Sequence, residues 1–235
     1  MMVIGHRGAA GLAPENTLGA IRKGLELGVQ GIEVDVQLTR DGKPVIIHDF
    51  SVDRTSNGTG EVANLTLEEI RRLDAGSWFG REFQGERIPT LVEVLETVPP
   101  NVMLNLELKQ ITFQRRGLEE AVAKELKQFG RWDNVVVSSF DHKALETIKG
   151  LLEDLRIGLL TYNYLLNPQV YLDSLGFQAY SVHPAFELVD QQDCKAYKER
   201  GLKVFCYTVN HHETAREIEA LGVDGIFTDR PDLFL

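Results

Sequence analysis

The sequence has little cysteine, no long apolar run and no basic cluster, and each shortage excludes a class of protein. Cys194 and Cys206 are its two cysteines among 235 residues, and the N-terminus does not resemble an export signal. We therefore expect free thiols in a cytoplasmic protein rather than a disulfide framework. No apolar stretch approaches the roughly 20 residues that a transmembrane helix needs, so no stable membrane association is expected.

Positive charge is also scarce. Lysine and arginine number 25 against 35 aspartate and glutamate residues, for a net charge of −10. Without a basic patch, binding of nucleic acid is not expected. A small anionic ligand would instead need cations placed at its own site. The sequence leaves the oligomeric state open.

Alternating strand and helix patterns fill the chain. Eight β–α units in about 250 residues are typical of a (β/α)8 barrel, so we predict one α/β TIM-barrel domain over residues 1–235. The predicted strands are Val3–His6, Ile32–Leu38, Val102–Leu108, Val135–Phe140, Arg156–Leu160, Ala179–Val182, Lys203–Val209 and Gly225–Thr228. The predicted helices are Thr17–Leu27, Thr90–Val98, Leu118–Phe129, Lys143–Leu152, Pro168–Leu175, Asp190–Arg200 and Glu213–Leu221.

A ninth strand, Pro44–His48, is predicted to form a hairpin with the second. Asp41-Gly42 between alternating apolar runs is typical of a two-residue type I′ turn, whereas parallel neighbours need a crossover of about a dozen residues. The resulting register places Asp35 opposite His48. Glu33 shares their face because side chains alternate along a strand.

The segment of approximately 50–89 interrupts the alternation of strands and helices. It contains Thr66 and Glu69, which predict a capping box at the start of a helix, and then Trp78. Long connections in barrels usually lie on the face of the βα loops, where substrates bind. We predict a small insertion on the active-site face, with Trp78 anchoring it on the barrel rather than contacting a ligand.

Three carboxylates should point into one space at the C-terminal ends of the strands, where barrel active sites occur. They belong to Glu33, Asp35 and Glu107. Two like charges about 4 Å apart repel by roughly 4 kcal/mol at an effective dielectric near 20. Such groups hold a proton, pair with a cationic side chain or bind a metal ion. Oxygen ligands alone favour Mg²⁺ or Ca²⁺ over zinc.

Two histidines and two cationic side chains accompany the carboxylates. His6 and His48 can act as general acid and base, in either assignment, because the pKa of histidine lies near neutrality. Arg7 and Lys109 suit an anionic substrate. Together with a cation they favour attack at a phosphodiester, with one imidazole protonating the leaving oxygen. Taken singly, His6 has a structural interpretation and Lys109 could simply pair with Glu107.

Polar residues also end the later strands. His183 is either a substrate contact or a strand-end residue, and Tyr207 is either a ligand or part of a pocket wall. Asp229 is expected to hold Arg230 or a nearby loop. Asn16 is expected to cap the first helix.

The motifs resemble those of the glycerophosphodiester phosphodiesterases over nearly the whole chain. The similar segments are Gly5-His6-Arg7-Gly8, Pro14-Glu15-Asn16-Thr17, Glu33-x-Asp35, His48-Asp49, Asp53-Arg54-Thr55, Gly58-Thr59-Gly60, Trp78-Phe79, Ile88-Pro89-Thr90-Leu91, Asn105-Leu106-Glu107-Leu108-Lys109, Ser138-Ser139-Phe140 and Asp224-Gly225-Ile226-Phe227-Thr228-Asp229. The family commonly has Trp-Thr-Val-Asn where this chain has Tyr207-Thr208-Val209-Asn210, so the smaller ring bears on headgroup preference.

The resemblance implies a metal-dependent hydrolase that cleaves glycerophosphodiesters to glycerol 3-phosphate and an alcohol. It implies one divalent cation, Mg²⁺ or Ca²⁺. The implied roles are metal binding for Glu33, Asp35 and Glu107, acid–base catalysis for His6 and His48, and phosphate neutralisation for Arg7 and Lys109. Two alternatives stand beside it: a phospholipase-type phosphodiesterase acting on lipids, and a non-catalytic barrel that binds phosphodiesters. The two histidines argue against the second, and the apparent lack of an apolar anchor favours water-soluble substrates over lipids.

Overall fold

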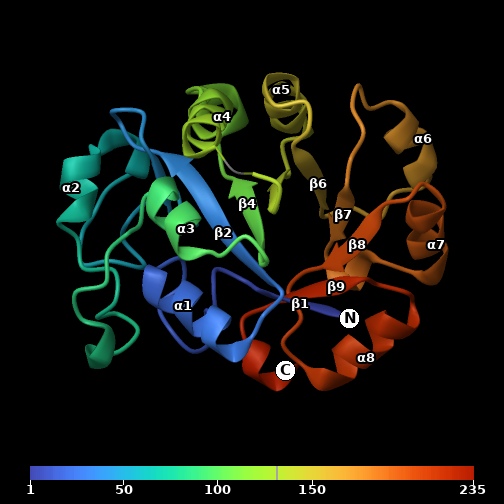
Figure 1. The fold of residues 1–235 in the computed structure, drawn as a ribbon, viewed down its shortest axis with the longest axis horizontal. Helices are drawn as coiled ribbons and strands as arrows, with labels where there is room; N and C mark the ends of the chain where they lie inside the picture. Colours follow the sequence, from blue (N-terminus) through green and yellow to red (C-terminus); the bar gives the residue numbers. More distant parts are fainter. Residues whose placement is uncertain (131) are drawn as a thin grey trace.

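Eight parallel strands close into a barrel (Figure 1). The structure is a computed structural model that describes residues 1–130 and 132–235. β1 pairs with both β2 and β9, which closes the ring and confirms the predicted (β/α)8 fold. The barrel strands are β1 (Met2–Gly5), β2 (Gly31–Leu38), β4 (Met103–Leu108), β5 (Val135–Ser139), β6 (Arg156–Thr161), β7 (Ser181–Pro184), β8 (Lys203–Cys206) and β9 (Gly225–Thr228).

Helices surround the barrel in Figure 1. They are α1 (Leu18–Leu27), α3 (Leu91–Thr97), α4 (Leu118–Phe129), α5 (His142–Leu151), α6 (Pro168–Asp173), α7 (Gln191–Glu199) and α8 (His212–Ala220). All seven were predicted, with ends displaced by up to a few residues. The expected cap of the first helix is wrong, because the Thr17 side chain accepts the bond from Ala20 N and Asn16 points elsewhere. No helix in the described part of the chain is both long enough and apolar enough to cross a membrane.

The outer face of the barrel strands, which packs against the helices, is apolar, and the face inside the barrel is partly polar. On β2, Val34 and Val36 join the large core between the barrel and its helices. The alternate positions carry Glu33, Asp35 and Gln37, all buried. A smaller apolar cluster of Ile4, Met103, Val136, Phe205 and Phe227 contributes to the interior. Cys194 and Cys206 are buried free thiols, as predicted.

The hairpin has a register one residue away from the predicted one. β3 (Pro44–Ile46) pairs with β2 so that Val36 lies opposite Ile46, and Ile47 N donates to Asp35 O at 2.9 Å. The predicted pairing of Asp35 with His48 is therefore wrong. The loop contains three residues instead of two, with Gly42 at φ +72° as its left-handed residue. This is the geometry of a longer hairpin loop that ends in a glycine bulge.

A threonine explains the longer loop. Thr39 N donates to Lys43 O at 3.1 Å, and the Thr39 hydroxyl both accepts from Lys43 N and donates to Asp41 Oδ1. Side chains of this kind compete with the ladder for backbone groups. They close the turn around Arg40, Asp41 and Gly42, a contribution that the Asp-Gly signal does not contain.

The chain leaves β3 before His48. The Gln37 amide nitrogen lies 2.7–2.9 Å from the carbonyl oxygens of Ile47, His48 and Asp49. This buried side chain holds the turn that carries His48 to the barrel mouth. The histidine thus lies near the carboxylates by way of a loop and not by strand pairing.

The segment after His48 has a small core of its own. It contains η1 (Val62–Asn64), α2 (Leu67–Arg71) and η2 (Arg81–Phe83), and α2 begins with the predicted capping box of Thr66 and Glu69. Val52, Val62, Ile70, Ala75 and Ile88 of this segment pack with Val45 and Ile47, which precede His48. Trp78 packs edge-on against Phe79, and its indole N–H donates to Ala75 O.

Candidate active site

A cavity of about 280 Å³ lies at the C-terminal end of the barrel strands. Eight of the nine site residues predicted from the sequence line it, and the ninth, Asp35, is buried against Arg7 and Lys109. Its lining consists of His6, Arg7, Glu33, His48, Asn105, Glu107, Lys109, Ser138, Phe140, Leu160, His183, Tyr207, Thr208 and Phe227.

The three carboxylates come together because β2 and β4 are neighbours. Asp35 lies opposite Glu107 in the parallel register, and Glu33 lies one inward position earlier. One oxygen from each carboxylate lies within 4.8 Å of the others. Burial and the charge of Asp35 raise the pKa of both Glu33 and Glu107.

This cluster fits a hard divalent cation. Glu33 Oε1 is buried and has no hydrogen-bond partner among the described residues. A buried acceptor with no partner is costly, and mutual repulsion adds to that cost. A cation ligated by oxygen atoms would remove both costs, so the donor set of Glu33, Asp35 and Glu107 suits Mg²⁺ or Ca²⁺.

Arg7 and Lys109 contact the acidic cluster and also face the cavity. Arg7 N donates to Glu33 Oε2 at 2.9 Å, and its Nε lies 3.4 Å from Asp35 Oδ2. Lys109 Nζ lies 3.1 Å from Glu107 Oε1 and 3.9 Å from Asp35 Oδ1. Both cations can therefore neutralise an anion placed above the carboxylates.

The loop after β1 needs its glycines. A Cβ on Gly5 would lie 2.1 Å from Gly8 O, and one on Gly8, whose φ is +89°, would lie 2.5 Å from the backbone of Ala20. This close packing leaves Arg7 at φ +51°. In this conformation the backbone N–H of Arg7 points at the carboxylate of Glu33.

Asn16 belongs to the site, although the sequence analysis assigned it to a helix cap. Its side-chain amide donates to Asp35 Oδ2 at 2.8 Å and accepts from Asp35 N at 3.1 Å. It lies at φ +59°, a conformation that asparagine tolerates better than most residues. Its side chain therefore orients a predicted metal ligand.

His6 lies between two carboxylates. Its Nδ1 is 2.6 Å from Asp229 Oδ1, and its Nε2 is 4.0 Å from Glu33 Oε2. Burial lowers the pKa of His6, but the bond to Asp229 and the charge of Glu33 outweigh it, and the pKa lies above its ordinary value. Arg230 bonds to Asp232 and not to Asp229, whereas Asp229 does hold a nearby loop, since it accepts from the side-chain amide of Asn210 at 2.7 Å.

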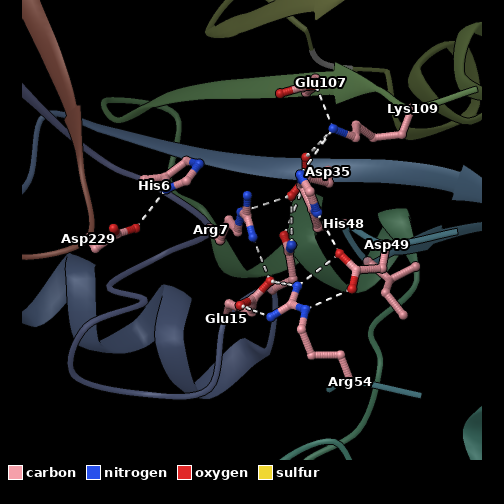
Figure 2. A network of polar contacts seen from close by, with 12 residues as sticks. His6, Arg7, Glu15, Asp35, His48, Asp49, Arg54, Glu107, Lys109 and Asp229 are labelled. Atoms are coloured by element: carbon pink, nitrogen blue, oxygen red, sulfur yellow. Dashed lines mark hydrogen bonds and ion pairs between the residues drawn. The ribbon is translucent and has the colours of Figure 1, made fainter. Parts of the chain in front are cut away.

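His48 has the opposite surroundings. Its Nδ1 lies 2.7 Å from Asp49 Oδ1, while its Nε2 lies 3.1 Å from the ammonium of Lys109. Burial lowers the pKa of His48 with help from Arg7 and Lys109, against the effect of Asp35 and Asp49. In Figure 2, His6 and His48 lie on either side of Arg7.

The remaining predicted residues form a neutral wall. His183 is fully buried, its Nε2 bonds to Ser181 Oγ, and burial lowers its pKa to about 3. Gly158 leaves room for it, since a Cβ there would meet its ring at 2.5 Å. The Tyr207 hydroxyl donates to Thr161 O at 2.9 Å, and its ring packs edge-on against Phe140. The ring of Tyr207 therefore faces the cavity while its hydroxyl is engaged.

Sequence reasoning missed several charged partners of these residues. Glu15 bonds to Arg7, Asp49 to His48, and Arg54 to both Glu15 and Asp49 (Figure 2). The one feature of the sequence that could have pointed to Glu15, Asp49 and Arg54 as site residues is that each lies in a segment that resembles the family. Asp229 was noted, but not as the partner of His6.

Comparisons with known proteins identify the family of this chain. The model of the glycerophosphoryl diester phosphodiesterase family matches residues 6–233. The chain is 43% identical over 235 residues to a glycerophosphodiester phosphodiesterase of Caldanaerobacter subterraneus subsp. tengcongensis, covering all of this chain and 96% of that protein. It is 37% identical over 232 residues to a glycerophosphodiester phosphodiesterase of Bacillus altitudinis, covering 98% of this chain and 95% of that protein.

A solved structure is similarly close. An Oleispira antarctica phosphodiesterase in complex with the product sn-glycerol-3-phosphate superposes with a TM-score of 0.92 at 36% identity, covering 98% of this chain and 94% of that one. The chain belongs to the glycerophosphoryl diester phosphodiesterase family.

Proposed function

We propose that this protein hydrolyses glycerophosphodiesters to glycerol 3-phosphate and an alcohol, using one Mg²⁺ or Ca²⁺ ion. The observation that carries the proposal is a cluster of three carboxylates, two of which line one cavity together with two histidines and two cationic side chains. Family membership and the product bound to the Oleispira antarctica relative support it.

The proposed metal ligands are Glu33, Asp35 and Glu107. The bound cation would stabilise negative charge on the phosphoryl oxygens. Arg7 and Lys109 would neutralise the rest of that charge, since both line the cavity within reach of the carboxylates. A bidentate guanidinium and a point-charge ammonium together orient the phosphate.

The hydrogen bonds favour one assignment of the two histidines. His6 has carboxylates beside both ring nitrogens, so it holds a proton that it can give to the leaving oxygen. His48 directs Nδ1 at Asp49 and Nε2 at an ammonium, so Nε2 carries a lone pair that can accept a proton. That proton comes from the attacking hydroxyl. If water attacks, glycerol 3-phosphate forms directly; if the substrate's own glycerol hydroxyl attacks, a cyclic phosphodiester forms and water then opens it to glycerol 3-phosphate.

We also propose that the chain acts as one catalytic domain, with the 50–89 segment on the active-site face. Arg54 supports this arrangement because it bonds to Asp49 and Glu15, the partners of His48 and Arg7. His183 and Tyr207 would form the wall against the substrate.

One observation favours lipid-like substrates as the second candidate. Phe113, Tyr162 and Leu166 are exposed by 82%, 67% and 104%. They lie in loops that follow β4 and β6, at the end of the barrel where the cavity lies. Amphiphilic diesters would place their apolar part against such residues.

Product release separates these candidates. The protein is incubated with glycerophosphocholine, glycerophosphoethanolamine, and phosphatidylcholine vesicles, each with EDTA, Mg²⁺ or Ca²⁺. We expect glycerol 3-phosphate from the soluble diesters, loss of turnover in EDTA and recovery with the metal. Activity confined to vesicles would favour the lipid candidate, and binding without turnover would favour a non-catalytic barrel.

A further inference from the structure

One side chain of the 50–89 segment binds two carboxylates at once (Figure 2). Arg54 Nε and Nη2 donate to the two oxygens of Asp49 at 2.7 and 2.9 Å. Arg54 Nη1 and Nη2 donate to the two oxygens of Glu15 at 2.8 and 2.9 Å. Four of the five guanidinium N–H groups are therefore used, and both contacts are bidentate.

Each of these carboxylates holds a proposed catalytic group by its other bond. Asp49 Oδ1 lies 2.7 Å from His48 Nδ1, and Glu15 Oε1 accepts from Arg7 Nη1 at 2.7 Å. A continuous series of bonds thus runs from His48 through Asp49, Arg54 and Glu15 to Arg7. Arg54 is its centre, and it comes from outside the barrel strands.

This network differs from an isolated surface ion pair. The Arg54 side chain is 45% exposed, and an isolated exposed pair contributes little to the free energy of unfolding, whereas a bidentate network can contribute more. Its geometry also has a consequence for position. The planar fork fixes the separation and the tilt of two carboxylates, and through them the direction of one imidazole and one guanidinium.

We propose that Arg54 is a positioning residue that sets the orientation of both His48 and Arg7 for catalysis. The inference rests on the proposed function for its kinetic part. Bonded to Arg54, Asp49 stays ionised and aligned, so it accepts from His48 Nδ1 and leaves Nε2 free to take a proton. Glu15, held by the same fork, directs Arg7 toward the phosphate. Lysine keeps the charge but cannot form two bidentate contacts.

The test compares Arg54→Lys and Arg54→Gln with the wild type in initial-rate assays on glycerophosphocholine with Mg²⁺. We expect kcat/KM to fall about 10- to 100-fold in both, because small displacements of reacting groups have effects of that size. The matched control is Arg72→Lys, since Arg72 forms an exposed ion pair with Glu68 in the same segment. The control should keep kcat/KM within about twofold.

A double-mutant cycle separates positioning from a general structural effect. Adding Asp49→Asn to Arg54→Lys should lower kcat little further, and adding Glu15→Gln should raise KM little further, because each pair acts as one unit. Multiplicative losses in both cycles, or Arg54→Lys with kcat/KM within twofold of wild type, would overturn the proposal. A wild type without turnover on any diester would instead refute the proposed function.

An NMR measurement tests the same geometry without turnover. In ¹⁵N-labelled wild type, His48 should show a protonated, hydrogen-bonded Nδ1 and an unprotonated Nε2. In Arg54→Gln the Nδ1–H signal should broaden or shift toward the mixed tautomer. An identical His48 signal in wild type and variant would contradict the inference.

Discussion

Replacing Glu33 by glutamine should stabilise the metal-free protein and abolish its stabilisation by metal. Glu33 is buried within 4.8 Å of the other two carboxylates, and its Oε1 has no hydrogen-bond partner in the described chain. The nearly isosteric amide removes the charge while keeping an oxygen that can accept from Arg7 N. The two effects have opposite signs, which makes the prediction hard to satisfy by accident.

The magnitude follows from Coulomb's law. Two charges 4.8 Å apart repel by about 3.5 kcal/mol at an effective dielectric near 20. Glu33 partly escapes this cost by holding a proton, since burial and Asp35 raise its pKa. We expect a gain of about 2–3 kcal/mol in the free energy of unfolding at pH 8, or roughly 5–10 °C in the thermal midpoint.

The pH dependence has a defined sign. A carboxyl whose folded-state pKa lies above its unfolded value of about 4.3 makes the wild type lose stability as pH rises past that value. The advantage of Glu33→Gln should therefore vanish near pH 4 and grow toward pH 8. Saturating Mg²⁺ or Ca²⁺, at about 100 times its Kd, should add about 2.7 kcal/mol to the wild type and little to the variant.

The assay is thermal unfolding in EDTA and in excess metal, at pH 4 and pH 8. Glu96→Gln is the matched control, since Glu96 is an exposed glutamate on α3, and it should change neither midpoint. A Glu33→Gln protein that is less stable than wild type in EDTA at pH 8, or that gains as much from metal, would refute the reasoning.

Three further predictions concern single residues. His48→Ala should lower kcat at least about 10²-fold in initial-rate assays while keeping the metal-induced rise in thermal midpoint, and near-normal turnover would remove its assigned role. Burial raises the pKa of Glu125 to about 7. Wild type should therefore lose stability between about pH 4.5 and 7, and Glu125→Gln should be more stable by roughly 1–2 kcal/mol at pH 8 but not at pH 4.5 in urea unfolding. Tyr207→Phe removes the bond to Thr161 O and should lower the free energy of unfolding by about 0.5–1.5 kcal/mol, so an unchanged midpoint would contradict a structural role for the hydroxyl.

The barrel could be predicted because its signals are local and repeated. Each strand carries its own apolar run, and each helix has its own period and ends. The same alternation along β2 that places Val34 outward places Glu33 and Asp35 inward. Neighbouring strands in sequence are neighbours in a barrel, so the meeting of Asp35 with Glu107 also followed.

The hairpin register, the position of His48 and the role of Asn16 depend on side-chain hydrogen bonds, which the hydrophobic pattern of the sequence does not encode. The hydroxyl of Thr39 lengthened the hairpin loop, and the amide of Gln37 turned the chain that carries His48. The predicted proximity of His48 to the carboxylates was right for a wrong reason. Asn16 was predicted as a cap, but its left-handed backbone directs it to Asp35.

The charged partners are the largest omission. Asp229, Asp49 and Glu15 come from loops far apart in sequence, and their partners are fixed by how those loops pack against one another. Arg54 illustrates the difficulty, because a lone arginine in a turn-rich run is typical of a solvated loop. Its two bidentate contacts exist only in the folded chain.

The most direct test of the central claim is calorimetric titration of the EDTA-treated, dialysed protein with Mg²⁺ and with Ca²⁺. Wild type should bind one ion per chain, and Glu33→Gln, Asp35→Asn and Glu107→Gln should each lose that binding event. Equal stoichiometry and affinity in wild type and the three variants would show that these carboxylates hold no metal, and the account of the site would be wrong.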